Sequence, residues 1–181
     1  MSTIGFDTSN YTTSTAWTDG KTDINVRQIL YVKDGERGIR QSDGVFQHMK
    51  LMPVMYEKLS EQIDFKDVKA VGVSTRPRCV EGSYMPVFLA GEGYAKVVAN
   101  TLGVPLYEFS HQDGHIMAGI YSSGSFELLE NDFISVHLSG GTTEILKSRY
   151  NGFYFDNEII GGSKDISAGQ STINENSVKS V

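Results

Sequence analysis

The chain has 181 residues, enough for one domain with a hydrophobic core or for one half of a two-lobed protein. Its net charge of −6 provides no basic surface for binding nucleic acid by itself. The single cysteine, Cys79, excludes an internal disulfide and is typical of a reducing compartment. No apolar run approaches the ~20 residues of a membrane span, and the first residues lack a signal-type apolar core. We therefore expect a cytoplasmic protein that is not embedded in a membrane.

Three antiparallel strands are predicted before any helix. The first covers residues 2–8, and the polar segment DTSNYTTS at 7–14 is expected to form the hydroxyl-rich tip of a hairpin. The second strand is expected at 15–17 and the third at 24–32, where apolar residues alternate with polar ones. This start argues against a plain Rossmann domain.

An amphipathic helix is predicted over residues 43–63, because apolar residues recur there in steps of four and three. Pro53 is expected to kink this helix. His48 lies off the apolar stripe, so we expect it to be exposed to solvent or to act as a capping residue. The stripe consists of Val45, Met49, Met52, Tyr56, Leu59 and Ile63.

Helices and strands alternate further along the chain. The apolar run at 68–74 predicts a buried parallel strand, and a helix is expected over 83–102, ended by Gly103. Further strands are predicted at 104–108, 133–138, 143–147 and 153–155, and Gly161-Gly162-Ser163 is expected to precede a helix over DISAGQ that Ser163 caps. The order predicts an α/β fold with a mixed sheet covered by helices.

Three of the four histidines lie in one stretch of the chain. His111 and His115 are four residues apart at the start of a predicted helix, which puts both imidazoles on one face, ~6 Å apart. His137 lies on the strand that leads into a Gly-Gly turn. Three such nitrogens would suit zinc, iron or nickel; the alternative is surface or core histidines. Gln112 occupies the place of the glutamate that a zincin requires, so nothing here supports peptide hydrolysis.

Four segments in this order resemble the tRNA threonylcarbamoyladenosine synthase family, formerly called O-sialoglycoprotein endopeptidases or glycoproteases. They are DTSNYTTS at 7–14, HQDGH at 111–115, HLSGGTTEI at 137–145 and GGSKDISAGQ at 161–170. The family has the two-lobed fold of actin, Hsp70 and sugar kinases, which is ribonuclease H-like. The resemblance implies that residues 1–170 form the first lobe and that the second lobe is absent. Residues 171–181 are polar without a helical stripe and are expected to form a tail.

The resemblance also implies two loops that face a nucleotide. The hairpin at 7–14 would face phosphate, and the loop at 139–143 would face ATP or an acyl-adenylate. Successive backbone N–H groups in a Gly-Gly turn can bind an anion, although either loop could equally be an ordinary turn. The implied contacts are Asp7, Ser9, Thr12, Ser139, Gly140, Gly141, Thr142 and Thr143.

The family's reaction implies a metal ion. Relatives with both lobes pass a threonylcarbamoyl group from a metal-bound adenylate to N6 of adenosine 37 in tRNA. The resemblance implies one Fe or Zn ion held by His111 and His115, with His137 at the position where some members have a tyrosine. The last ligand would be an aspartate of the second lobe. The metal would polarise the carbamoyl carbonyl.

Two departures from the family pattern affect this interpretation. No aspartate stands near Thr172 and Ile173, where the pattern continues, so the resemblance stops after Gln170 as in a truncated or frameshifted gene. The family's Gly-Pro-Gly after the central strand is replaced by Arg76-Pro77-Arg78. Two guanidinium groups there favour an anionic or carboxylate ligand, the alternative being a surface loop. These departures indicate a divergent paralogue.

Three functions are consistent with these residues. The first, which we favour, is the metal- and nucleotide-binding lobe of a threonylcarbamoyl-transferase-like protein, inactive as a lone lobe because a cleft needs two walls. The second is a non-catalytic subunit that pairs with itself or with a homologous partner, and that meets tRNA only within a larger complex. The third is a small-molecule phosphotransferase of the same fold, for which Asp7 and the hydroxyl-rich hairpin would bind the nucleotide.

Overall fold

The computed structural model describes residues 1–35, 38–138 and 143–163. The chain divides into two compact units, Met1–His111 and Gln112–Val181. The tail predicted at 171–181 lies outside the described residues, so the division into a lobe and a tail stays a prediction. None of the helices in the described part of the chain is long and apolar enough to cross a membrane.

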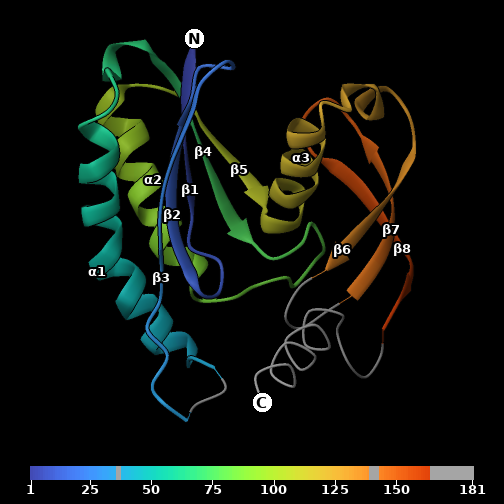
Figure 1. Ribbon diagram of the computed structural model, residues 1–181, viewed down its shortest axis with the longest axis horizontal. Coiled ribbons are helices and arrows are strands. Elements are labelled where there is room, and N and C mark those ends of the chain that lie inside the picture. Colours follow the sequence, from blue (N-terminus) through green and yellow to red (C-terminus); the bar gives the residue numbers. More distant parts are fainter. Residues whose placement is uncertain (36–37, 139–142, 164–181) are drawn as a thin grey trace, which may run out of the picture. The chain divides into compact units, whose positions relative to one another are not determined.

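The first unit is built on a five-stranded mixed sheet (Figure 1). Strands β1 (Ser2–Asp7), β2 (Thr12–Thr18) and β3 (Asp23–Ile29) form an antiparallel meander. Strands β4 (Val68–Arg76) and β5 (Leu106–Ser110) extend the sheet in parallel with β1, which gives the order β3-β2-β1-β4-β5. The predicted start of three antiparallel strands, followed by parallel ones, is confirmed.

Two helices cover one face of this sheet (Figure 1). They are α1 (Gln41–Ser60) and α2 (Phe88–Leu102). Alternate residues of β1 point to opposite faces, so Ile4 and Phe6 are buried under the helices, whereas Asp7 is on the opposite face. The buried core consists of Ile4, Phe6, Met52, Leu59, Val68, Val71, Val73, Ala95 and Ala99.

Several predicted boundaries in the first unit are wrong. Strand β2 already begins at Thr12, which shortens the hairpin tip, and Asn10 makes the turn with a φ of 50°, a conformation that asparagine tolerates better than most residues. Helix α2 begins at Phe88 and not at residue 83. The segment before it turns at Gly82, with a φ of 74°, and contains Pro86, which has no N–H to donate. Helix α1 continues past Pro53, as predicted, but spans Gln41–Ser60 where 43–63 was predicted.

The predicted apolar stripe of α1 is also partly wrong. His48, expected at the surface, is fully buried, and Met49 is 47% exposed. The imidazole of His48 can be buried because its Nδ1 makes a 2.7 Å hydrogen bond with Oγ1 of Thr13. The buried face of the helix consists of Gly44, His48, Met52, Met55 and Leu59.

The second unit contains a three-stranded antiparallel sheet packed against a helix. Helix α3 (His111–Ser123) starts at the last residue of the first unit and is followed by the 3-10 turn Phe126–Glu130. The strands are β6 (Phe133–Leu138), β7 (Thr143–Tyr150) and β8 (Phe155–Gly162), in that order. Their buried core with α3 consists of Ile116, Ile120, Leu146 and Phe155.

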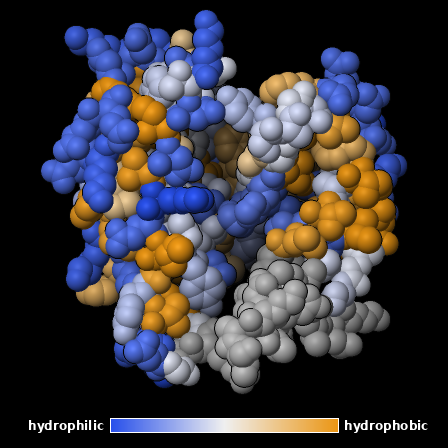
Figure 2. Space-filling view, viewed as in Figure 1, coloured by the Kyte–Doolittle hydropathy of each residue, from blue (hydrophilic) through white to orange (hydrophobic). Residues whose placement is uncertain are grey.

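The bounds predicted for β6 are confirmed. Gly161 and Gly162 belong to β8 and pair with β7, so the chain is still extended there; the helix expected beyond them lies outside the described residues. One face of β6 remains open: Ile134, Val136 and Leu138 are each more than half exposed. Figure 2 shows hydrophobic residues gathered over this sheet.

A pair of alanine substitutions in α2 tests the packing of the first unit. A Cβ on Gly91 would lie 2.9 Å from Oγ1 of the buried Thr8, so we expect Gly91→Ala to lower the free energy of unfolding by about 1–3 kcal/mol. Gly93 has no neighbour within 4 Å, so Gly93→Ala should raise it by about 0.5–1 kcal/mol. Urea unfolding measures both. Equal stabilisation by the two substitutions would contradict the contact between Thr8 and α2.

Candidate metal and nucleotide site

Polar residues gather where the parallel strands of the first unit end. Asp7 ends β1, Ser110 ends β5, and β4 between them ends at Arg76. Because these strands are parallel, their carboxyl ends meet at one edge of the sheet, which is where open α/β sheets bind ligands. The strand order therefore brings Asp7 to His111, the residue that follows β5.

Asp7 and His111 are in direct contact across this edge. Oδ2 of Asp7 lies 2.9 Å from Nδ1 of His111, and Oδ1 accepts a 2.7 Å hydrogen bond from the amide of Ser9. Burial of Asp7 opposes its ionisation. The hydrogen bond and charge of His111, with further hydrogen bonds from Ser9 and Ser74, outweigh burial and lower the pKa of Asp7 to about 2. Asp7 is therefore a carboxylate at neutral pH.

The contact orients the imidazole of His111. A carboxylate on one ring nitrogen selects the tautomer with the proton on that nitrogen and directs the other nitrogen, Nε2, toward a ligand. This is the arrangement behind most metal-binding histidines, although a purely structural ion pair has the same geometry. Within the described part of the first unit, His111 thus has its Nδ1 held by a carboxylate.

The hairpin at the end of β1 presents its hydroxyl groups on the same face as Asp7. Asp7 pairs with Ser14 across the hairpin, so the side chains of Ser14 and Thr12 lie on the face opposite the helices. Oγ of Ser14 donates to the carbonyl of Asp7 at 3.4 Å, and the amide of Thr12 bonds the carbonyl of Ser9 at 3.4 Å. The predicted contacts Asp7, Ser9 and Thr12 therefore belong to one ordered hairpin.

The second unit contains a pair of histidines. The rings of His115 on α3 and His137 on β6 have centroids 5.5 Å apart, with 43° between their planes. Two imidazoles bound to one tetrahedral ion, with metal–nitrogen distances of ~2.0–2.1 Å, have centres roughly 5 Å apart. The spacing of the pair therefore fits a shared metal ion.

A buried carboxylate lies behind this pair, and sequence reasoning missed it. Oε2 of Glu144 is 3.8 Å from Nδ1 of His137 and accepts a 3.2 Å hydrogen bond from Nε2 of Gln112. Both Glu144 and Gln112 are buried. The alternation along β7 was the available signal, because Glu144 has the same parity as the buried residues Leu146 and Ser148. An acid at an inward position indicates a partner inside the unit.

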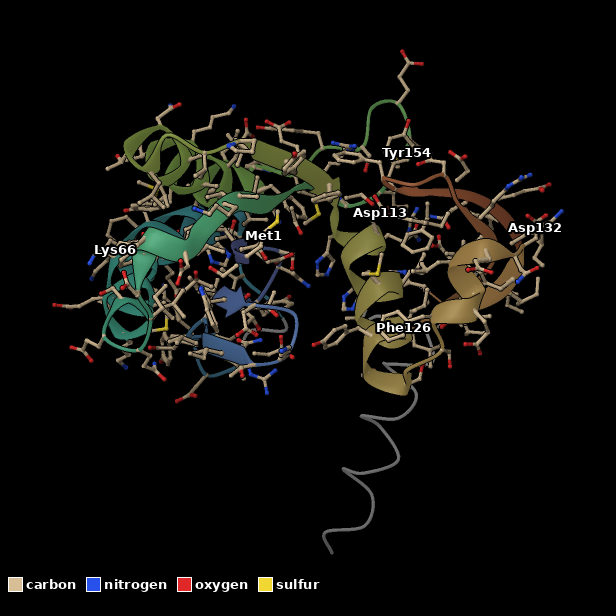
Figure 3. All side chains as sticks on the ribbon, turned by 90° about the horizontal axis from the view of Figure 1, so that it is seen from above. Met1, Lys66, Asp113, Phe126, Asp132 and Tyr154 are labelled. Carbon is tan, nitrogen blue, oxygen red and sulfur yellow. The ribbon has the colours of Figure 1, made fainter. Side chains whose placement is uncertain are left out.

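Asp113 fixes the start of α3 within the second unit. Its Oδ1 accepts a 3.4 Å hydrogen bond from the amide of Phe155 on β8. In Figure 3, Asp113 lies on α3 beside the strand that leads from Tyr154. This bond holds the first turn of the helix against the sheet and so sets the position of His115, two residues later.

The three-histidine site predicted from sequence stays a prediction. His115 and His137 are brought together, and His111 contacts Asp7. Within the described ranges, no three His, Cys, Asp or Glu side chains are grouped so that they could hold a metal ion. Of the predicted nucleotide loop, Ser139, Gly140, Gly141 and Thr142 lie outside the described residues, and Thr143 begins β7.

The two arginines proposed for anion binding lie at and just after the end of β4. Nη1 of Arg76 donates to Oγ1 of Thr75 at 3.1 Å, and the amide of Arg78 donates to Oγ of Ser83 at 3.0 Å. Both residues are half-buried. Their place at the carboxyl end of a parallel strand suits a ligand contact, and the anion-binding role stays a prediction.

Comparison with solved structures identifies the fold. YeaZ from Pseudomonas aeruginosa superposes with a TM-score of 0.51 at 11% identity, over 90% of this chain and 66% of that one. The ethanolamine utilization protein EutJ from Carboxydothermus hydrogenoformans superposes with a TM-score of 0.50 at 18% identity, over 99% of this chain and 57% of that one. The fold is the actin-like ATPase fold, as predicted.

Sequence comparison identifies the family. The chain belongs to the tRNA N6-adenosine threonylcarbamoyltransferase (TsaD) family, whose profile matches residues 36–178. It is 32% identical over 121 residues to the enzyme of that name from Christiangramia forsetii, covering 66% of this chain and 33% of the relative. The relative from Pyrobaculum calidifontis is 27% identical over 168 residues, covering 92% and 45%. The chain thus spans less than half the length of these relatives.

The lowered pKa of Asp7 predicts how stability depends on pH. A carboxyl whose pKa falls from 3.8 to about 2 on folding stabilises the fold above pH ~4 by about 2 kcal/mol, and this contribution is lost as the pH falls toward 2. Asp7→Asn should therefore lower the free energy of unfolding by about 2 kcal/mol at pH 7 and by much less at pH 2. Urea unfolding at both pH values measures this.

The exposed carboxyl of Glu81 provides the matched control. Glu81→Gln should change the free energy of unfolding by less than ~0.5 kcal/mol at either pH. An effect of Asp7→Asn that is equally large at pH 2 and pH 7 would contradict a stabilising contribution from the ionised Asp7.

Proposed function

We propose that the chain provides the metal- and nucleotide-binding part of a threonylcarbamoyl-transferase-like protein that modifies adenosine in tRNA in the cytoplasm. The observation that carries the proposal is the contact between Asp7 and His111, in which an ionised carboxylate holds Nδ1 of an imidazole. Family membership supplies the class of reaction. The contact supports a metal ion at the carboxyl ends of the parallel strands.

The proposed ligands of a divalent Fe or Zn ion are His111, His115 and His137. Support for this donor set comes from the preference of both metals for imidazole nitrogens, from the carboxylate 2.9 Å from Nδ1 of His111, and from the carboxylate 3.8 Å from Nδ1 of His137. Bound there, the metal would act as a Lewis acid on the carbamoyl carbonyl. Asp7 and Glu144 would orient the rings of His111 and His137, respectively.

The hairpin that carries Asp7 is the proposed nucleotide contact. The negative charge of Asp7 would repel a phosphate group unless a cation lies between them, so the hydroxyls of Ser9 and Thr12 are the groups that would meet phosphate directly. The loop at 139–143 is the second proposed contact with the nucleotide, and this proposal rests only on the sequence of the loop. Turnover of ATP with a small hydroxyl acceptor would instead favour a phosphotransferase of this fold.

We further propose that these 181 residues do not catalyse transfer by themselves. The relatives from Christiangramia forsetii and Pyrobaculum calidifontis are matched over 33% and 45% of their lengths, so most of each relative has no counterpart here. Groups on one wall of a cleft remain hydrated, and water weakens their interaction with a substrate. Catalysis would then require the chain to act with further polypeptide.

Metal analysis tests the proposed ligands. Protein purified without chelator should contain about one equivalent of Fe or Zn, and His115→Ala and His137→Ala should each lose most of it, because each removes a ligand. Asp7→Asn should weaken metal binding by about 10–100-fold through loss of the group that orients His111. Elemental analysis and competition with a chelator measure these effects. The control is Ser122→Ala, on the exposed side of α3.

A result in which all variants retain the metal content of the unmodified protein would overturn the ligand assignment. A complete absence of metal, both as purified and after incubation with Fe or Zn, would overturn the metal-binding role itself.

A second candidate function, a partner subunit, is favoured by the open face of β6. Ile134, Val136 and Leu138 are 58%, 59% and 59% exposed on one side of an edge strand. Contiguous exposed apolar residues mark interaction surfaces, and here they would suit a second copy of the chain or a homologous subunit.

If the chain self-associates through this face of β6, a charge introduced there should weaken the dimer. Val136→Lys should shift the chain from dimer to monomer in sedimentation velocity, because a lysine cannot be buried at an apolar interface without a partner. The control is Val97→Lys on α2, where a valine is 64% exposed, which should leave the dimer intact. A chain that sediments as a monomer at all concentrations, without a copurifying homologue, would contradict the partner-subunit function.

A further inference from the structure

His48 is a buried polar residue that the metal and nucleotide contacts do not involve. It lies on α1 and has no exposed surface. Its Nδ1 makes a 2.7 Å hydrogen bond with Oγ1 of Thr13, which is also fully buried and is 35 residues away in the sequence. A buried polar pair costs desolvation. Its presence therefore points to a specific geometric role.

The imidazole of His48 acts as a neutral hydrogen-bonding group. Burial lowers the pKa of His48 below its usual value of 6.5, and the backbone of Asn10 and the charge of Asp7 offset this only in part. At neutral pH the ring is therefore uncharged and its bond with the Thr13 hydroxyl is a neutral one. His48 thus positions β2 through the geometry of a neutral hydrogen bond and not through an ionic interaction.

The hairpin between β1 and β2 is anchored on both sides by buried threonines. Before the turn, Oγ1 of Thr8 donates to the carbonyl of Val87 at 2.8 Å and accepts from the amide of Gly91 at 3.0 Å, which ties the hairpin to α2. After the turn, Thr13 ties it to α1 through His48. The residues between the two anchors, 9–12, include Ser9 and Thr12 of the proposed nucleotide contact.

The second anchor sets which face of β2 carries the hydroxyls. Side chains alternate along a strand, so a Thr13 that points into the core leaves Thr12 and Ser14 on the face of Asp7. A shift of one residue would exchange the two sets. The bond between His48 and Thr13 thus opposes the movement that would turn the hydroxyls away from Asp7.

We infer that His48 is a positioning residue for the proposed nucleotide site: it acts through Thr13 to hold the β1–β2 hairpin so that Ser9 and Thr12 share a face with Asp7. The inference rests on the function proposed above and adds a residue on α1 that would touch neither nucleotide nor metal. Sequence reasoning had placed His48 at the surface, so neither its burial nor its role was expected.

Three variants of the full chain test the inference. His48→Leu and Thr13→Val remove the bond from either side while filling the space, and His48→Asn keeps a polar atom near the position of Nδ1. The control, Leu59→Ala, opens a cavity in the same helix about 16 Å away along the axis. Two measurements are made on each protein: amide hydrogen exchange at residues 9–12, and titration with MgATP.

The expected result separates positioning from general stability. His48→Leu and Thr13→Val should each speed exchange at residues 9–12 and weaken MgATP binding by about tenfold, the effect of losing one buried hydrogen bond. In His48→Asn, the exchange rate at residues 9–12 and the affinity for MgATP should both lie within about threefold of the unmodified protein. Leu59→Ala should lower the midpoint of urea unfolding without changing exchange at residues 9–12.

Two outcomes would overturn the inference: exchange at residues 9–12 that is the same in Thr13→Val and the unmodified protein, or exchange that increases equally in Leu59→Ala. Thr13→Val is nearly isosteric, so it decides the question even if His48→Leu does not fold. An unmodified protein that binds no MgATP, but whose variants show the exchange difference, would overturn the proposed nucleotide role and still support the anchoring of the hairpin by His48.

Discussion

The contact between the carboxylate of Asp7 and the imidazole of His111 joins residues 104 positions apart in the chain. It can form only because β1 and β5 run in the same direction in one sheet, with β4 between them. A carboxylate that remains ionised in a largely buried setting needs hydrogen bonds and a polarisable partner, and His111, Ser9 and Ser74 supply them. The edge where the parallel strands end therefore holds the ionised Asp7 and is the proposed site.

A second carboxylate lies near an imidazole within the second unit, at 3.8 Å and without the hydrogen bond that joins Asp7 to His111. Glu144 lies on the Nδ1 side of His137, as Asp7 does for His111, and Gln112 holds Glu144 in place. Groups that orient ligands are often as important for metal binding as the ligands themselves.

Much of the fold follows from patterns that sequence reasoning can detect. The apolar run of β4 predicted a buried parallel strand, and the alternation of β6 predicted its bounds, because both patterns reflect burial directly. His48 could not be predicted, because a histidine's burial depends on Thr13, a partner in another element. Ser74 was missed for the same reason: only the pairing of β4 with β1 brings it to Asp7. Periodicity shows which residues are buried, whereas polar partners across elements depend on the topology.

Imidazole nitrogen chemical shifts test the central claim most directly, because the chain has only four histidines. The measurement is a long-range proton–nitrogen correlation spectrum of the full chain, recorded during titration with Zn²⁺. The account predicts that Nε2 of His111, His115 and His137 moves to the metal-bound range while the buried His48 is unaffected. A titration in which none of these three nitrogens responds, or in which His48 responds in their place, would contradict it.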